Sequence, residues 1–253
     1  MIDIGRAFKA PFEDTDWVSK TLLGFLWGLL GVTAPAVYGA QLDYISGVAS
    51  GDERLPDWSD FGRKWVEGFM VFLAGLLYFL PVVVLGFVFV VPPIIALVSA
   101  NDQNGALGAV LGGGLCIFWV IALMYSIVVS VFFSAAMTNY AMRRNFGSFF
   151  DFGGIMALVR GGTGYFTAWL YTILIAFVGS AIVSVLSATG VGAVLAPAVA
   201  YLVAMISGHV LGQWARQAFG VQTIVASAAG PSGYPQATPP APPAPPAPPA
   251  PPV

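Results

Sequence analysis

The stretch 55-LPDWSDFGRKWVEG-68 marks an abrupt change of polarity along the chain. It holds five charged residues and two tryptophans, whereas the next charged residue in the sequence is Asp102. Trp58 and Trp65 lie at helical spacing, beside a row of charged residues on a neighbouring face, which is the pattern of an amphipathic helix. Because tryptophan favours the headgroup zone of a bilayer, the pattern predicts an in-plane helix over residues 57–68 that leads into an apolar span.

The overall composition is that of a membrane protein. Of the 253 residues, 58% are hydrophobic and 9% are charged, whereas a soluble domain carries roughly 25% charged residues. Such a chain cannot cover a surface that faces water, so we expect an all-α polytopic membrane protein with the lipid bilayer as its main partner. The net charge of −2 argues against nucleic acid as a partner.

Five apolar segments follow one another through the predicted membrane domain, residues 21–221. The first, residues 21–48, is interrupted by Pro35 and is too short for two crossings, because each needs about 20 residues. Positive charge flanks it on both sides, so it is either a re-entrant hairpin bent at Pro35 or a fifth span. The other four segments are predicted to be full spans, at about 66–91, 115–140, 163–187 and 190–214.

The positive charges indicate the orientation. All ten Lys and Arg residues lie before the first segment, between the first and second, between the third and fourth, or after the fifth. Because positively charged loops remain in the cytoplasm, these regions and the C-terminal tail are predicted to be cytoplasmic. The four full spans then form two hairpins with short outer turns.

Other polar stretches are predicted to lie along the membrane surface. Residues 1–20 form an N-terminal interfacial segment, and residues 146–160 form a second in-plane helix. The sequence from 60 to 78 is similar to that from 151 to 171, since both begin with Asp-Phe-Gly and end with tyrosine. This similarity predicts a duplicated unit of one in-plane helix followed by two spans. Four tryptophans near the ends of apolar segments are predicted interfacial anchors: Trp17, Trp58, Trp65 and Trp214.

Two motifs carry a resemblance to a known family. The stretches "PFEDTDWVSKTLLGFLWGL" and "LPDWSDFGRKWVEGF" resemble an uncharacterised prokaryotic integral membrane family catalogued as domain of unknown function 4013. The resemblance extends over about residues 8–217. It implies a multispan protein of the prokaryotic cytoplasmic membrane, and it implies no activity and no catalytic residue. The residues that carry it are Asp16-Trp17, Lys20, Leu55-Pro56-Asp57-Trp58, Asp60, Phe61-Gly62 and Gly68.

The polar residues inside the apolar segments offer little chemistry. His209, Gln213 and Arg216 form a stripe at i, i+4 and i+7, which predicts either interhelical hydrogen bonds or part of a solute or proton path. Asp43 is expected near the cytoplasmic interface. One histidine and one cysteine cannot complete a zinc site, and no nucleophile elbow or phosphate loop is present. We therefore expect no catalytic residue, metal or cofactor.

The C-terminal tail, residues 222–253, carries no charged side chain and ends in proline–alanine repeats. Such a sequence cannot bury enough apolar surface to fold, and it favours an extended polyproline II conformation. The tail is therefore expected to be disordered and to act either as a spacer or as a docking arm. In the second case, Pro239–Pro252 would bind a cytoplasmic protein that recognises PxxP motifs.

Two functions are compatible with these features. The first is a non-enzymatic membrane scaffold, shaping or interaction protein, favoured by the in-plane helices, the re-entrant segment and the proline tail. The second is a small-solute or lipid transporter, favoured by the internal repeat, by the prolines at 81, 92 and 93, and by the stripe at His209.

Overall fold

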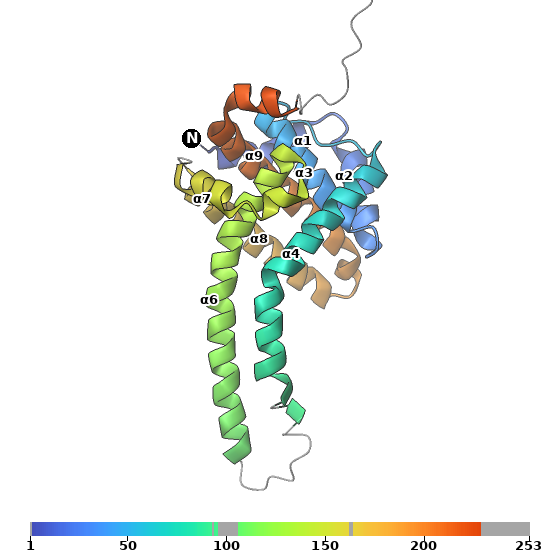
Figure 1. Ribbon diagram of the computed structural model, residues 1–253. Helices are drawn as coiled ribbons and strands as arrows, with labels where there is room; N and C mark the ends of the chain where they lie inside the picture. The colour runs from blue at the N-terminus through green and yellow to red at the C-terminus, as the bar shows by residue number, and fades with distance from the viewer. Residues whose placement is uncertain (1, 93, 96–105, 162–163, 229–253) are drawn as a thin grey trace, which may run out of the picture.

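The chain folds entirely as helices in a computed structural model that describes residues 2–92, 94–95, 106–161 and 164–228. The described helices and 3₁₀ segments pack mainly against α3 and α9 (Figure 1). In chain order they are α1 (Ile4–Glu13), α2 (Trp17–Leu29), α3 (Pro35–Ser50), α4 (Phe61–Phe89), α6 (Ala106–Arg143), η1 (Phe146–Phe149), α7 (Phe152–Gly161), α8 (Tyr165–Ala188), η2 (Val191–Leu195) and α9 (Ala196–Ala228).

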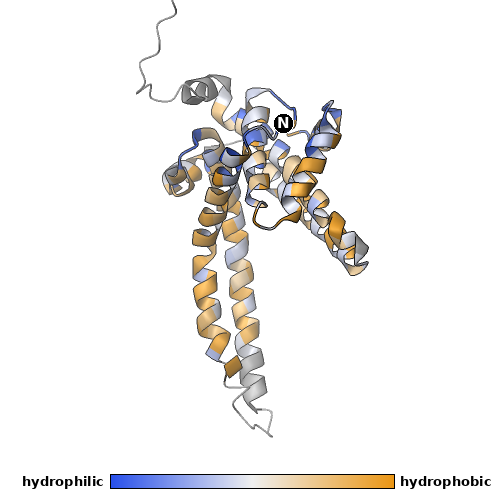
Figure 2. Ribbon diagram, turned by 90° about the vertical axis from the view of Figure 1, so that its right-hand side faces the viewer, coloured by the Kyte–Doolittle hydropathy of each residue, from blue (hydrophilic) through white to orange (hydrophobic). Residues whose placement is uncertain are grey.

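Four helices are long and apolar enough to cross a membrane, which confirms the predicted spans. They comprise α4, the part of α6 from Gly113 to Arg143, α8, and the segment Gly192–Gly220 that includes most of α9. Figure 1 shows α4 and α6 projecting from the rest of the molecule as a long hairpin. In Figure 2 this hairpin is hydrophobic along its length, whereas hydrophilic residues gather at the end that holds the N-terminus. The chain is therefore a multi-pass membrane protein.

The first apolar segment forms two short helices rather than one long one. α2 has 13 residues and α3 has 16, so they extend about 20 and 24 Å, less than the roughly 30 Å of a hydrocarbon core. Pro35 is the first residue of α3, where its missing N–H removes no helical hydrogen bond. Before it, the Thr33 hydroxyl donates to the carbonyls of Trp27 and Leu30 and closes the end of α2. The bend predicted at Pro35 is present.

Glycines allow α3 to lie unusually close to its two main neighbours. A Cβ at Gly39 would overlap the backbone of Lys64, and a Cβ at Gly68 would overlap the carbonyl of Pro35, so α3 and α4 meet almost backbone to backbone. On the other side, a Cβ at Gly212 would lie 2.6 Å from Cβ of Val48. The Gly208–Gly212 pair thus provides a contact surface for α3, as small residues do in membrane helix pairs.

The α2–α3 hairpin lies along α9. Gly24 of α2 faces the ring of Tyr201, and a Cβ at Gly28 would lie 3.1 Å from Cβ of Pro197, near the start of α9. The tip of the hairpin therefore lies beside the first turn of α9. α8 packs on another side of the same helix, where Gly179 admits Val203.

The predicted in-plane helices differ from the observed ones at their boundaries. Residues 57–60 are not helical, because Asp57 Oδ1 accepts hydrogen bonds from the N–H and hydroxyl of Ser59 in a local turn. The helix begins at Phe61 and continues without interruption as α4. Although α4 is continuous, its first part is inclined to its second part (Figure 1).

The predicted helix over 146–160 is two elements, η1 and α7. Asn145 caps η1 by accepting from the N–H of Gly147, and Asp151 caps α7 by accepting from the N–H of Gly154. The two copies of the predicted repeat also differ, since α4 is unbroken whereas α7 and α8 are separate helices with Gly164 at φ +92° between them. The local structure of the first copy is therefore not repeated in the second.

The last helix extends further than predicted. α9 continues to Ala228 across a kink at Gly220, so residues 222–228 are helical instead of belonging to the tail. The remainder of the predicted tail, residues 229–253, and the outer-turn residue Asp102 lie outside the described residues.

Candidate functional site

A cluster of charged side chains joins α3, α4 and α6, and Asp43 lies at its centre. The Asp43 carboxylate is 2.9 Å from Nη2 of Arg63, 2.9 Å from Nζ of Lys64 and 2.9 Å from Nη2 of Arg144. Glu67 forms a second acceptor, since Arg63 and Arg144 also pair with its carboxylate. The cluster of Asp43, Arg63, Lys64, Glu67 and Arg144 is called the α3 ion cluster below.

The α3 ion cluster is buried enough for its pairing to matter. Lys64 is only 2% exposed, and a buried ammonium without a counter-charge would be strongly unfavourable. Burial opposes ionisation of Asp43, but the hydrogen bonds from Arg63 and Lys64 outweigh it and lower the pKa of this carboxyl to about 2. Asp43 is therefore the anion that allows three cations to converge between the helices.

The stripe predicted from the sequence lies along another side of α3, beside Tyr44 and Val48 in the second half of that helix. The His209 ring is fully buried, with Nδ1 3.0 Å from Nε2 of Gln213. The Gln213 amide accepts from the N–H of Asp3 and donates to its carbonyl, which fixes the orientation of the amide. Its NH₂ group therefore points at Nδ1, so a neutral His209 carries its proton on Nε2, 3.6 Å from Oε2 of Glu53.

Arg216, the third member of the stripe, binds the end of α3. Its Nε and Nη2 both donate to the carbonyl of Val48, in the last turn of that helix, where a cation is favourable. Arg216 also lies 3.7 Å from Glu53, which pairs with Nε of Arg6 at 2.7 Å. Burial opposes ionisation of Glu53, but the hydrogen bond with Arg6 and the interactions with His209 together outweigh burial and lower the pKa of this carboxyl.

A third polar contact fixes the start of α2 to the loop before α4. Oδ2 of Asp14 accepts from Lys20 Nζ at 2.8 Å and from the N–H of Leu55 at 2.9 Å, while Lys20 also donates to the Leu55 carbonyl. Burial opposes ionisation of Asp14, but the bond from Lys20 contributes to lowering its pKa. These contacts hold both ends of the α2–α3 hairpin at the charged end of the molecule.

The predicted tryptophan anchors have specific protein contacts. The indole N–H of Trp58 donates to the carbonyl of Lys20 at 3.0 Å, and that of Trp65 donates to the carbonyl of Val32 at 2.7 Å, so both connect the hairpin to the α4 region. Trp17 is half-buried and packs edge-on against Phe12. Trp214 is fully buried against the ring of Tyr165. Its prediction as an interfacial anchor is wrong, because its side chain cannot reach lipid.

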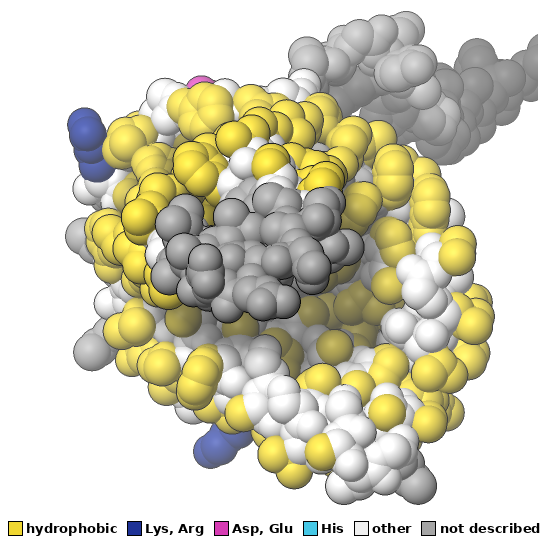
Figure 3. Space-filling view, turned by 90° about the horizontal axis from the view of Figure 1, so that it is seen from below, with side chains coloured by type: hydrophobic (Ala, Val, Ile, Leu, Met, Phe, Trp, Pro, Cys, Tyr) yellow, Lys and Arg dark blue, Asp and Glu magenta, His cyan; other side chains and the backbone are white. Residues whose placement is uncertain are grey.

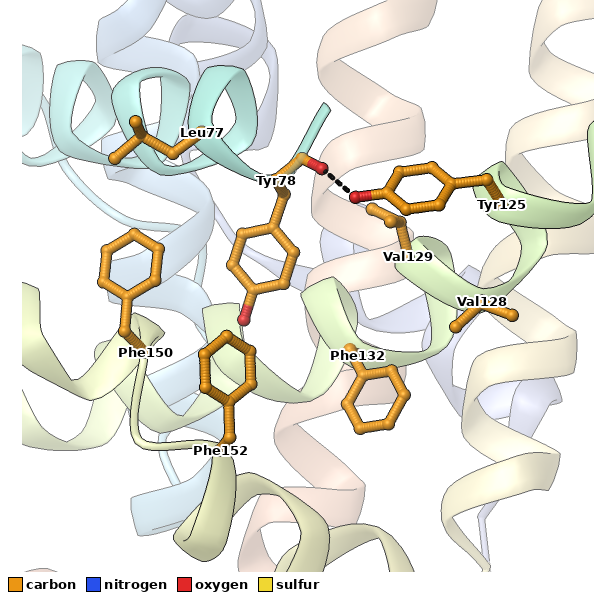
Figure 4. A pocket seen from close by; sticks show the side chains of 8 residues that line it. All are labelled: Leu77, Tyr78, Tyr125, Val128, Val129, Phe132, Phe150 and Phe152. Carbon is orange, nitrogen blue, oxygen red and sulfur yellow. Dashed lines mark hydrogen bonds between the residues drawn. The ribbon is translucent and has the colours of Figure 1, made fainter. Parts of the chain in front are cut away.

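Two cavities lie between the helices. One, of about 620 Å³, is bounded by α3, α8 and α9. The other, of about 400 Å³, is a mainly aromatic pocket beside Pro81 of α4 (Figure 4). There the hydroxyl of Tyr125 donates to the carbonyl of Tyr78, within the turn where the proline interrupts helical hydrogen bonding. The Tyr78 hydroxyl donates to the carbonyl of Phe149, which connects this bend to η1.

Residues 22–188 match the model of a family described as Protein of unknown function (DUF4013). The chain belongs to the DUF4013 family. No curated protein and no solved structure matches the chain.

The DUF4013 match confirms the resemblance inferred from the sequence, over a shorter range. It includes every member of the α3 ion cluster, whereas His209, Gln213, Arg216 and the Asp16-Trp17 motif lie outside it. The family brings no activity to this chain. The predicted stripe therefore has defined partners, while its role in a solute or proton path stays a prediction.

Sequence reasoning did not identify the central residue of the α3 ion cluster in this DUF4013 protein. Asp43 was expected to be an ordinary interfacial carboxylate, and its three cationic partners lie in α4 and at the end of α6. The one available signal was that Asp43 is the only charged residue of the first apolar segment, 21–48. A lone carboxylate within such a segment requires partners from elsewhere in the fold.

Proposed function

We propose that the protein is a non-enzymatic membrane-shaping scaffold in which the α2–α3 hairpin inserts part-way into the membrane from the cytoplasmic side. The observation that carries this proposal is the outer surface of the hairpin. Large apolar side chains on it are exposed and have no protein neighbour to bury them: Val18, Leu22, Leu26, Leu29, Leu30 and Val32. An apolar surface of this kind requires lipid or another apolar partner.

The dimensions of the hairpin support a wedge that enters the membrane from one side without crossing it. Its helices are shorter than a hydrocarbon core, and its tip lies against the start of α9, which is itself a candidate span. The backbone at the bend, residues 30–34, is covered on one side by Trp65, as irregular backbone at depth requires. A volume inserted from one side expands the leaflet on that side relative to the other and favours curvature.

The surface seen from the tip of the α4–α6 hairpin also supports membrane insertion. It is mostly hydrophobic, and charged side chains are visible only at its edge (Figure 3). The charged clusters around α3 fix the wedge to the spans, so that insertion of the hairpin is coupled to the whole bundle. In this proposal the ion pairs have a structural role.

The test is the size of vesicles formed from lipid and purified protein at increasing protein-to-lipid ratio, measured by electron microscopy. The wild type is expected to reduce the mean diameter. A triple variant that removes apolar side-chain volume from the hairpin, Leu22→Ala, Leu26→Ala and Leu30→Ala, is expected to lose most of the reduction in vesicle diameter. The matched control removes the same atoms from exposed leucines of α4, by Leu76→Ala, Leu77→Ala and Leu80→Ala, and is expected to retain the effect. Equal behaviour of both triples would contradict the proposal.

Transport of a small solute or lipid is a second candidate. The cavity between α3, α8 and α9 favours it, because transporters bind their cargo within the membrane domain. The two functions differ in an observable way, since transport requires flux of a cargo across the bilayer and membrane shaping does not.

The location and the tail belong to the same proposal. The distribution of Lys and Arg supports a cytoplasmic location for the charged end of the molecule and the tail. The membrane would be the prokaryotic cytoplasmic membrane that the family resemblance implies. In a scaffold, Pro239–Pro252 would recruit a cytoplasmic partner that recognises PxxP motifs. Pull-down with and without this segment tests the recruitment.

A further inference from the structure

The cavity between α3, α8 and α9 has the size and lining of a ligand site. Its volume of about 620 Å³ lies within the 300–1,000 Å³ common for small-molecule pockets. α3 and α8 both pack against α9, and the space remains between them. Among the residues that the structure describes, no Asp, Glu, Lys, Arg or His lines this cavity.

Two buried polar side chains in the lining have no partner. Gln41 of α3 and Ser207 of α9 are each 7% exposed, and neither side chain has a hydrogen bond to any of the described residues. Their polar atoms are not among the fully enclosed, unpaired side-chain atoms of the described residues, so they are accessible from the cavity. A molecule in the cavity could therefore form hydrogen bonds with both, as polar groups in apolar surroundings require.

The wall contributed by α8 explains why space remains. Ala176, Ser180 and Ser184 recur every four residues and turn a face of small side chains toward the cavity. Gly179 brings α8 close to Val203, so the two helices touch beside the cavity instead of filling it. The wall is thus largely apolar, with hydroxyl groups along it, and Gln41 and Ser207 are the buried polar residues of the lining.

We propose that this cavity binds an uncharged amphiphilic lipid, of the diacylglycerol class, with its hydroxyl and ester groups at Gln41 and Ser207 and an acyl chain along α8. The carboxamide both donates and accepts, as a hydroxyl and an ester require. A charged head group is excluded because no opposite charge lines the site, and the nearby carboxylate of Asp43 is already paired with Lys64. Lipid binding in this cavity does not depend on the membrane-shaping role. If the protein is instead a transporter, the bound lipid would be its cargo.

The test uses the purified full chain in detergent and two photoactivatable probes with identical diazirine acyl chains. One probe is diacylglycerol and the other is phosphatidic acid. The diacylglycerol probe is expected to label peptides of α8 and α9 that line the cavity, at several-fold higher yield than phosphatidic acid, and excess unlabelled diacylglycerol should compete. Gln41→Leu is expected to weaken labelling about three- to tenfold, the effect of one hydrogen bond.

A matched pair of variants keeps the test decisive even if Gln41→Leu does not fold. Ala176→Phe fills the cavity, whereas Ala181→Phe places the same ring on the same helix outside the lining. Both positions are exposed, so both variants should fold. Loss of labelling in Ala176→Phe alone supports the proposal. Equal labelling of both variants, or labelling by phosphatidic acid as strong as by diacylglycerol, would overturn it.

Discussion

Replacing Asp43 by asparagine should destabilise the protein more than any comparable surface change. The substitution keeps the volume of the side chain but removes the charge that Arg63, Lys64 and Arg144 share. Lys64 would then remain buried without a full counter-charge. Removing one partner of a buried ion pair typically destabilises by about 3–5 kcal/mol.

The pKa of Asp43 gives an independent magnitude. A pKa lowered from 3.8 to about 2 corresponds to about 2.5 kcal/mol of stabilisation by the ionised form, at roughly 1.4 kcal/mol per unit. The two arguments together predict that Asp43→Asn lowers the free energy of unfolding by about 2–4 kcal/mol. Because the folded-state pKa is the lower one, this stabilisation is complete above about pH 4 and is lost as the pH falls from about 4 toward 2.

The assay is equilibrium unfolding in mild detergent, followed by tryptophan fluorescence. Asp60→Asn is the matched control, since Asp60 is 3.9 Å from Arg63 but its side chain is 69% exposed, and we expect an effect below about 0.5 kcal/mol. The double variant Asp43→Asn, Lys64→Met should lose less stability than the two single variants combined, because it leaves no buried ammonium. In acid, the wild type should lose more stability than Asp43→Asn between about pH 4 and 2.

The reasoning would be refuted by an Asp43→Asn variant whose stability matches that of Asp60→Asn. Equal acid sensitivity of the wild type and Asp43→Asn would equally show that the ion cluster does not stabilise the fold. Either result would remove the α3 ion cluster as the connection between the hairpin and the spans.

Other perturbations test the packing, the stripe and the tail. Gly68→Ala should prevent correct assembly, because its Cβ would overlap a backbone carbonyl of α3, whereas Gly62→Ala, which meets nothing within 4 Å, should purify like the wild type in size-exclusion chromatography. His209→Ala should lower the free energy of unfolding by about 2 kcal/mol, since it removes a fully buried ring; an unchanged stability with lost pH-dependent flux would favour transport instead. Truncation after Gly230 should leave the melting temperature and membrane insertion unchanged, because residues 239–252 contain only proline and alanine; a lower melting temperature would show that the tail packs against the helices.

The features that depend on local sequence could be predicted. The four spans follow from the length of apolar runs, and the bend at Pro35 follows from the missing N–H of proline. The start of α4 could not be placed as well, because Asp57 is suited both to capping a helix and to closing a turn with Ser59. Only the tertiary arrangement decides between these two local structures.

The features that depend on distant contacts could not be predicted. The partners of Asp43 are at least 20 residues away along the chain, and Arg144 is 101 residues away. Trp214 has the residue type of an interfacial anchor, but its position on α9 turns it toward Tyr165 and into the interior. Likewise, the cavity at Gln41 exists because two helices pack against a third, which no single stretch of sequence encodes.

The depth of Val32 tests the central claim of a partly inserted hairpin most directly. Val32 is 81% exposed at the bend between α2 and α3, so the protein itself does not shield it. In a Cys116→Ala background, a cysteine at Val32 would be treated with a membrane-impermeant maleimide in right-side-out and in inside-out vesicles, with a cysteine at Ser59 marking the charged side. The account predicts no reaction at Val32 from either side, and reaction at Ser59 from one. Reaction of Val32 from the side opposite to Ser59 would show that the hairpin spans the membrane, and reaction from the same side would show that it lies outside the bilayer.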